Sequence, residues 1–81
     1  KLSYKDQRAL DTLPDTIDKL GAEIEALGNE LANPDLFTGD PKRFKAASAR
    51  LEAAQTELDD AENRWLELEE LRESIEKARA S

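Results

Sequence analysis

The residues best able to do chemistry in this sequence are four cations that follow Pro41, namely Lys42, Arg43, Lys45 and Arg50. No acidic residue lies between Pro41 and Leu51, although the rest of this segment is strongly acidic. Clustered basic side chains can contact backbone phosphates, because each neutralised phosphate releases condensed counterions. We therefore predict a phosphate-contacting cluster at this position. The alternative is a solvated helix start, although cations there oppose the helix dipole.

A second cationic group lies at the start of the chain and consists of Lys1, Lys5 and Arg8. Lys5 and Arg8 are three residues apart, so they share one face of a helix. In the register derived below they lie opposite the acidic segment 67–70. The stronger interpretation is interhelical ion pairing, and nucleic-acid contact by these three residues is the alternative.

Several other chemistries are missing from the sequence. It contains no cysteine and no histidine, which removes thiol nucleophiles, the imidazole base and the usual zinc ligands. Carboxylates are numerous, but a thin helical rod cannot bury them to raise a pKa. The acidic residues Asp35 and Asp40 lack the ligand spacing of a calcium loop. We predict no catalytic residue, no metal site and no cofactor in this segment.

The composition indicates an all-α chain forming one small domain over residues 1–81. Alanine, glutamate, lysine, leucine and arginine supply 47 of the 81 residues, as in long helices and coiled coils. Valine is absent, so little material for a sheet exists. Apolar runs are too short for a membrane span or a signal peptide, which predicts a cytoplasmic protein. The net charge of −7 argues against generic nucleic-acid binding. The sequence does not begin with Met, which suggests that it is a piece of a longer protein.

Start and stop signals divide the chain into helices. Ser3 can cap a helix over about residues 4–12, and Pro14 then begins a second helix, about 14–32, or kinks the first. The turn-rich segment 33–40 connects to a long helix over about residues 41–78. Because the apolar phase continues across Pro14, both halves of the first arm face the same partner. The arm is therefore expected to be kinked or broken.

Heptad spacing predicts an antiparallel two-helix coiled-coil hairpin. Facing residues of such a hairpin have nearly constant index sums, and here the sums alternate between 75 and 74. The layers that sum to 75 are Leu31 with Phe44, Ile24 with Leu51, Ile17 with Leu58, and Leu10 with Trp65. The layers that sum to 74 are Leu27 with Ala47, Leu20 with Ala54, and Leu13 with Ala61. Tyr4 with Leu71 is expected to extend this register to the open end.

The four aromatic residues are mostly expected in the core. Trp65 and Phe44 occupy seam positions, which predicts burial. Phe37 is expected to fold back and close the turn, with base stacking by an exposed ring as the alternative. Off the seam, Leu66 and Leu71 leave homodimerisation open, although we predict a monomer.

Three phrases of the sequence resemble a known family. They are the opening KLSYKDQRALDTLP, the turn ANPDLF with GDP beyond it, and the late RWLELEEL. Together they resemble the C-terminal coiled-coil domain of ABC-F ATPases of the Uup type, over essentially the whole chain. The sequence departs from the family at Thr38 and Gly39, where bulkier or charged residues are common.

The resemblance implies an appendage of a soluble bacterial protein with two ATP-binding cassettes that use ATP and Mg²⁺. It also implies action on ribosomes and a DNA-binding role for the appended domain. No Walker motif or ABC signature occurs here, so ATP chemistry would belong to the parent protein. We predict a non-catalytic coiled coil that contacts DNA or structured RNA such as ribosomal RNA. The alternative is a spacer that docks on the ATPase cassettes or on ribosomal proteins without touching nucleic acid.

Overall fold

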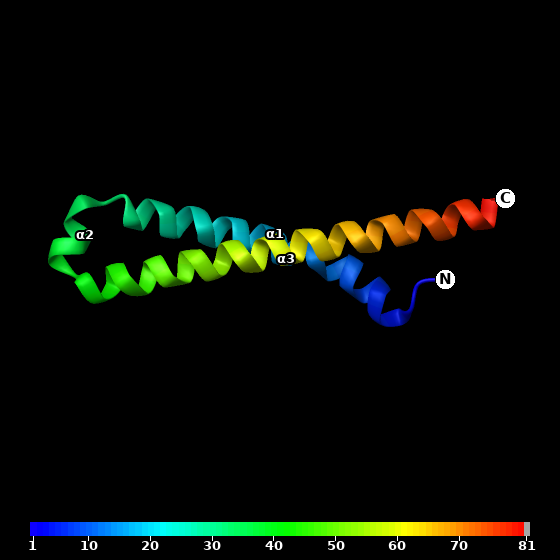
Figure 1. Cartoon of the computed structure of the whole chain (residues 1–81), viewed down its shortest axis with the longest axis horizontal. Coiled ribbons are helices and arrows are strands. Elements are labelled where there is room, and N and C mark those ends of the chain that lie inside the picture. Colours follow the sequence, from blue (N-terminus) through cyan, green and yellow to red (C-terminus); the bar gives the residue numbers. More distant parts are fainter. Residues whose placement is uncertain (81) are drawn as a thin grey trace.

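A computed structural model describes residues 1–80, and its secondary structure is entirely helical. The three helices are α1 (Tyr4–Leu31), α2 (Pro34–Gly39) and α3 (Pro41–Ala80). The long helices α1 and α3 lie side by side and run in opposite directions, with α2 joining them at one end, here named the α2 end (Figure 1). The molecule measures 63 × 18 × 15 Å. The predicted all-α class is confirmed.

Each helix begins at the kind of residue that its sequence predicts. The hydroxyl of Ser3 accepts a hydrogen bond from the Asp6 amide at 3.1 Å, which caps α1. The Asp40 carboxylate accepts one from the Arg43 amide at 3.1 Å, at the start of α3. Between them, Asn33 caps the short helix α2, which occupies the segment predicted as a turn. These side chains satisfy amides that have no partner within their helices.

Helix α1 does not break at Pro14, which corrects the division into helices over residues 4–12 and 14–32. One helix runs from Tyr4 to Leu31 with Pro14 inside it. Thr12, the expected cap of a new helix, instead donates its hydroxyl to the Arg8 carbonyl at 3.1 Å. The cost of the missing proline amide is one hydrogen bond. The apolar contacts on both sides of Pro14 outweigh that cost, because both halves of α1 face α3.

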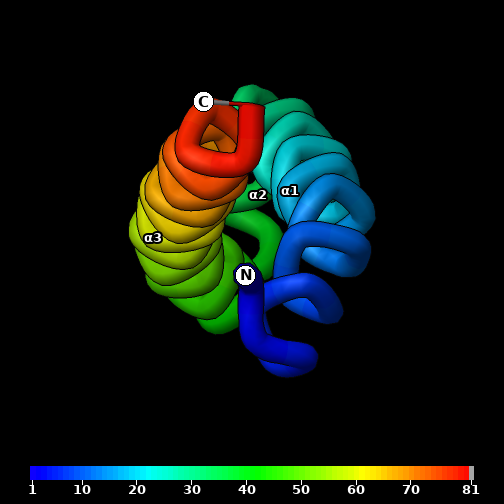
Figure 2. Tube along the Cα trace, turned by 90° about the vertical axis from the view of Figure 1, so that its right-hand side faces the viewer, coloured from blue at the N-terminus to red at the C-terminus, as the bar shows by residue number. Residues whose placement is uncertain are grey.

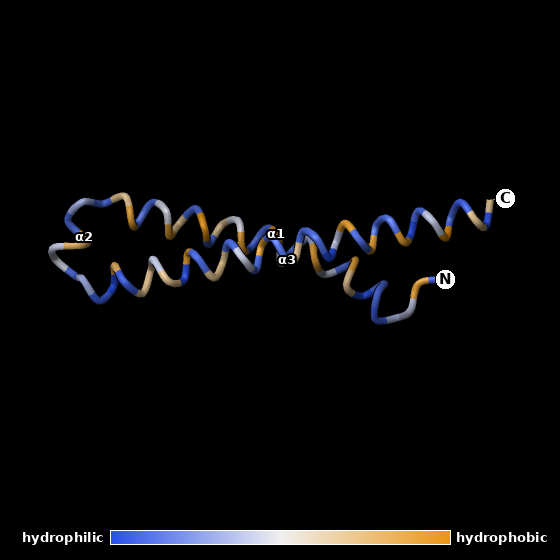
Figure 3. The backbone as a smooth tube through the Cα atoms, viewed as in Figure 1, coloured by the Kyte–Doolittle hydropathy of each residue, from blue (hydrophilic) through white to orange (hydrophobic). Residues whose placement is uncertain are grey.

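The core is a single layer of side chains between the long helices. Leu20, Ala54 and Ala61 form its buried centre, and Leu13, Ile17, Ile24 and Leu58 pack against them. Ala47 and Ala54 are fully buried at 0 % exposure, so large leucines meet small alanines across the interface. Hydropathy colouring shows apolar bands recurring along both helices (Figure 3). These residues include members of the predicted Ile17–Leu58 and Leu20–Ala54 layers.

The two sides of this core differ in burial. We label the apolar heptad positions a (Leu10, Ile17, Ile24 and Leu31; Phe44, Leu51, Leu58 and Trp65) and d (Leu13, Leu20 and Leu27; Ala47, Ala54, Ala61 and Leu68). The d positions are buried except Leu13, whereas the a positions are half-buried except Leu10. Both exceptions lie within one turn of Pro14. Water therefore reaches the core mainly from the side of the a residues.

The helices separate at the end that carries both chain termini. Figures 1 and 2 show the first turns of α1 diverging from the last turns of α3. Tyr4 is 79 % exposed and Leu71 is 44 % exposed, so the expected Tyr4–Leu71 layer does not form. An ion pair joins the helices nearby, with Arg64 Nη2 2.9 Å from Asp6 Oδ1.

Within residues 1–80 no helix is both long enough and apolar enough to cross a membrane.

Candidate nucleic-acid interface

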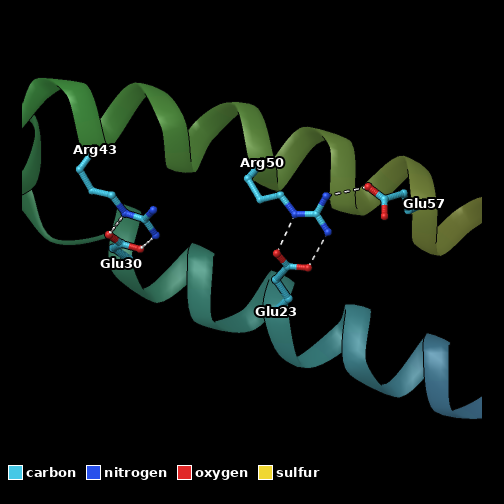
Figure 4. A network of polar contacts seen from close by, with 5 residues as sticks. All are labelled: Glu23, Glu30, Arg43, Arg50 and Glu57. Carbon is cyan, nitrogen blue, oxygen red and sulfur yellow. Dashed lines mark hydrogen bonds and ion pairs between the residues drawn. The ribbon is translucent and has the colours of Figure 1, made fainter.

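Arg43, one of the four cations predicted to contact phosphate, is held by a carboxylate of α1. Its Nε and Nη2 atoms each donate to a different oxygen of Glu30, both at 2.5 Å (Figure 4). This hydrogen-bonded pairing lowers the pKa of Glu30 and raises that of Arg43. The guanidinium is thus committed to a bidentate contact between α1 and α3.

Arg50 makes the same kind of contact one heptad further along α3. Its Nε and Nη2 donate to Glu23 at 2.6 and 2.7 Å, and its Nη1 donates to Glu57 at 2.8 Å (Figure 4). Hydrogen bonds from Arg50 lower the pKa of Glu23, and both glutamates raise the pKa of Arg50. Arg50 therefore already faces two carboxylates and has little capacity to hold a phosphate.

These glutamate partners were not predicted from the sequence. Glu23 and Glu30 are seven residues apart, as are Arg43 and Arg50, and each facing pair sums to 73. That arithmetic matches the register of the apolar layers and could have identified the pairs. The four predicted cations are therefore not equivalent, because the arginines join the helices and the lysines do not.

Lys42 and Lys45 are exposed near the α2 end and differ from the exposed Arg43 in their partners. They are three residues apart on α3, so they share a face, and neither forms an ion pair within the described chain. The next residues on this face are the exposed alanines Ala46 and Ala49. Their short side chains leave room for an extended polyanion to approach both ammonium groups.

An exposed aromatic ring lies beside these lysines. Phe37 of α2 is 61 % exposed. Its ring meets that of Phe44 edge to face, with centroids 5.1 Å apart and an interplanar angle of 87°. Phe44 stands between Lys42 and Lys45 in the sequence, so the contact places Phe37 next to the lysine-bearing turn. Phe37 thus folds back as expected and also keeps most of its surface available.

The second predicted cluster lies at the opposite end of the rod. Lys1, Lys5 and Arg8 are exposed, and none forms an ion pair within residues 1–80. The expected pairing with segment 67–70 does not form, because the first turns of α1 diverge from α3 at this end (Figure 1). Within that segment Glu69 instead pairs with Arg72 of its own helix at 2.8 Å. Lys1 lines a shallow groove together with Arg72 and other residues of both chain ends. The structure therefore separates the two cationic clusters rather than bringing them together.

The carboxylates show none of the burial that acid–base chemistry uses. No polar or charged side chain among residues 1–80 is buried. Where ion pairing changes a glutamate, as in Glu69 beside Arg72, the hydrogen bond lowers its pKa rather than raising it. In the part of the chain that the structure describes, no group of three acidic side chains could hold a metal ion.

Comparison with known proteins gives one match. The model of the ABC transporter C-terminal domain family matches residues 1–70. No curated protein and no solved structure shows a significant match. The matched segment includes α1, α2 and most of α3, and it contains the KLSYKDQRALDTLP phrase and all of the RWLELEEL phrase except its last residue, Leu71. The resemblance noted from those phrases is thereby confirmed, and the chain belongs to the ABC transporter C-terminal domain family.

Proposed function

We propose that this chain is a non-catalytic accessory domain of a cytoplasmic ABC-F ATPase of the Uup type. In this proposal, α1 and α3 form an antiparallel coiled-coil hairpin whose tip, the α2 end, contacts DNA or structured RNA such as ribosomal RNA. ATP and Mg²⁺ would bind to cassettes of the parent protein, and the hairpin would position those cassettes on their nucleic-acid target.

The observation that carries this proposal is the combination of Phe37, Lys42 and Lys45 on one exposed tip. The ring of Phe37 is mostly uncovered, and the lysines have no acidic partner within residues 1–80. Exposed rings stack on unpaired bases, and ammonium groups contact backbone phosphates. This tip offers both types of contact at one end of the rod, although the whole chain is acidic.

The anchored arginines support the same arrangement indirectly. Arg43 and Arg50 join α3 to α1 directly behind the tip. A rod that carries its contact residues at one end needs such bridges, because bending would move the end away from its target. The mechanism is recognition of backbone and shape, with little selectivity for sequence.

The test is fluorescence anisotropy of labelled duplex DNA, single-stranded DNA and structured RNA, each titrated with the 81-residue chain at several salt concentrations. The Lys42→Gln/Lys45→Gln variant should bind more weakly, and its slope of log affinity against log salt should shrink by about 2. Phe37→Leu should weaken binding to single-stranded DNA by about 1 to 3 kcal/mol, with a smaller effect on the duplex.

The matched control is Lys5→Gln/Arg8→Gln, which removes the same charge at the other end of the rod. The proposal requires this control to bind like the unmodified chain. Equal losses in both double variants would show a nonspecific charge effect, and loss only in the control would move the site to the chain termini. Absence of binding at low salt would overturn the proposal and favour the protein-docking spacer.

A further inference from the structure

An apolar groove near the middle of the rod is used by none of the functions discussed so far. It has a volume of about 410 Å³ and is lined by Pro14, Ile17, Asp18, Glu62, Trp65 and Leu66. Leu66 is 51 % exposed, and the seam residues Ile17 and Trp65 are only half-buried. The groove therefore exposes core side chains that both long helices contribute.

Its position follows from a difference between the two flanks of the helix pair. The heptad position beside d is g, and the position beside a is e. The g positions carry Glu23, Glu30, Arg43 and Arg50, whose ion pairs cover the buried d residues. The e positions form what we name the open flank, and they are Pro14, Gly21 and Gly28 on α1 and Ser48, Gln55 and Glu62 on α3. No ion pair crosses this flank within residues 1–80.

Gly21 and Gly28 continue the open flank along α1 beyond Pro14. A Cβ atom added at Gly21 or Gly28 would meet no atom within 4 Å. Neither position needs glycine for its backbone, because no glycine among the described residues has a positive φ. A glycine inside a helix is unfavourable relative to alanine, and among the described residues no atom lies close enough to these two positions to require one. Space beside a helix backbone suits the close approach of a second helix.

The charges beside the groove indicate what kind of helix would fit. Asp18 and Glu62 line the groove itself, and Glu25 and Asp59 continue the acidic border along α1 and α3. All four are exposed, and none forms an ion pair within the described residues. A second copy of this chain, with its net charge of −7, would bring like charges together there.

We infer that the open flank is a docking site for an amphipathic helix of a partner protein, with an apolar stripe bordered by lysine or arginine. The stripe covers Ile17, Trp65 and Leu66, and the basic residues pair with Asp18 and Glu62. The helix lies against Gly21 and Gly28, completing a three-helix arrangement in which the a residues become as buried as the d residues. The groove itself lies near the middle of the rod, whereas Lys42 and Lys45 lie at the α2 end.

The experiment uses two labelled helical peptides about three heptads long. One carries a leucine stripe bordered by lysines, and the other carries the same stripe bordered by glutamates. Anisotropy with the 81-residue chain measures binding, and the emission of Trp65 reports location because it is the only tryptophan. The lysine-bordered peptide should bind and shift Trp65 emission to shorter wavelength, while the glutamate-bordered peptide should bind about tenfold more weakly or worse.

Two variants with matched substitutions locate the site. Gly21→Gln/Gly28→Gln places long side chains on the open flank and should weaken peptide binding by about tenfold or more while raising the Tm. Ala22→Gln/Asn29→Gln places the same final side chains at exposed positions of α1 away from α3 and should leave binding unchanged. Because the glycine variant is expected to be more stable, its loss of binding cannot be attributed to unfolding.

Three results would overturn the inference. They are no binding of the lysine-bordered peptide, equal binding of both peptides, or binding that persists in the Gly21→Gln/Gly28→Gln variant. A fourth such result could come from sedimentation of the chain at two concentrations. If the chain self-associates and Gly21→Gln/Gly28→Gln abolishes this association, a second copy of the chain is the occupant of the open flank. None of these outcomes depends on whether the tip binds nucleic acid.

Discussion

Arg50 and Glu23 lie 27 residues apart in the sequence and meet through two parallel hydrogen bonds of 2.6 and 2.7 Å. This fork-to-fork geometry fixes both the distance and the register between α3 and α1 at that point. Arg43 and Glu30 repeat it one heptad nearer to α2. The two contacts define which flank of the helix pair is covered, and they give Arg43 and Arg50 carboxylate partners within the chain.

These pairs predict how stability depends on pH. Pairing lowers the pKa of Glu23 and Glu30 below the ordinary value of 4.5 in the folded state. Their contribution is therefore complete above pH 4.5 and is lost as the pH falls through the lowered folded values. The Tm difference between the unmodified chain and Glu23→Gln/Glu30→Gln should be a few degrees at neutral pH and should shrink below pH 4.5.

Thermal unfolding followed by circular dichroism from neutral to acidic pH measures this difference. The control is Glu25→Gln/Glu52→Gln, because both side chains are exposed and form no ion pair within residues 1–80. A Tm difference that the control reproduces would mean that net charge, rather than the two bridges, sets the pH dependence.

Ala54 is 0 % exposed and belongs to the buried core cluster between the two long helices. Ala54→Leu would insert three carbon atoms between α1 and α3. Overpacking of this kind costs about 1 to 3 kcal/mol, so denaturant unfolding should show a lower midpoint. The adjacent Ala53 is exposed, and Ala53→Leu should leave the midpoint nearly unchanged. Equal effects at both positions would contradict the assigned register.

Leu68, at the terminal end of the core, allows the opposite test, in which buried side-chain volume is removed rather than added. It is 1 % exposed, although the neighbouring turns of α1 are already diverging. Leu68→Ala removes buried methyl groups and should cost about 2 kcal/mol or more in unfolding free energy. Leu71→Ala, at a side chain that is 44 % exposed, should cost clearly less. A small effect of Leu68→Ala would show that the helices are not packed together there.

The heptad spacing predicted the all-α class and the facing layers, because the spacing of apolar residues determines which side chains face the partner helix. Leu20 and Ala54 lie together in the core as their index sum requires. The same arithmetic failed at Tyr4, which is 79 % exposed, because it assumes straight helices and α1 diverges from α3 there. The apolar phase across Pro14 predicted that both halves of the arm face the same partner, but the local effect of the proline led us to expect a kink or a break, and the break does not occur.

The candidate site was predicted less completely than the fold. A run of cations in a sequence shows where charge lies, but it does not show which charges have partners on another helix. Arg43 and Arg50 had such partners, and Lys42 and Lys45 did not. A search for apolar residues could not identify the open flank. The features that mark it are two glycines in the sequence and, in the structure, the half-burial of a positions such as Ile17, Ile24 and Trp65.

Pro14 provides a direct test of the continuous helix. Inside α1 it removes a hydrogen bond and costs about 3 kcal/mol relative to alanine, whereas its rigidity in the unfolded chain returns about 1 kcal/mol. Pro14→Ala should therefore raise the unfolding free energy by roughly 1 to 2 kcal/mol. Pro41→Ala should bring no such gain, since Pro41 is the first residue of α3, where a missing amide costs nothing. If Pro14→Ala were neutral or destabilising by denaturant unfolding, Pro14 would instead begin a separate helix, and α1 would be two helices rather than one.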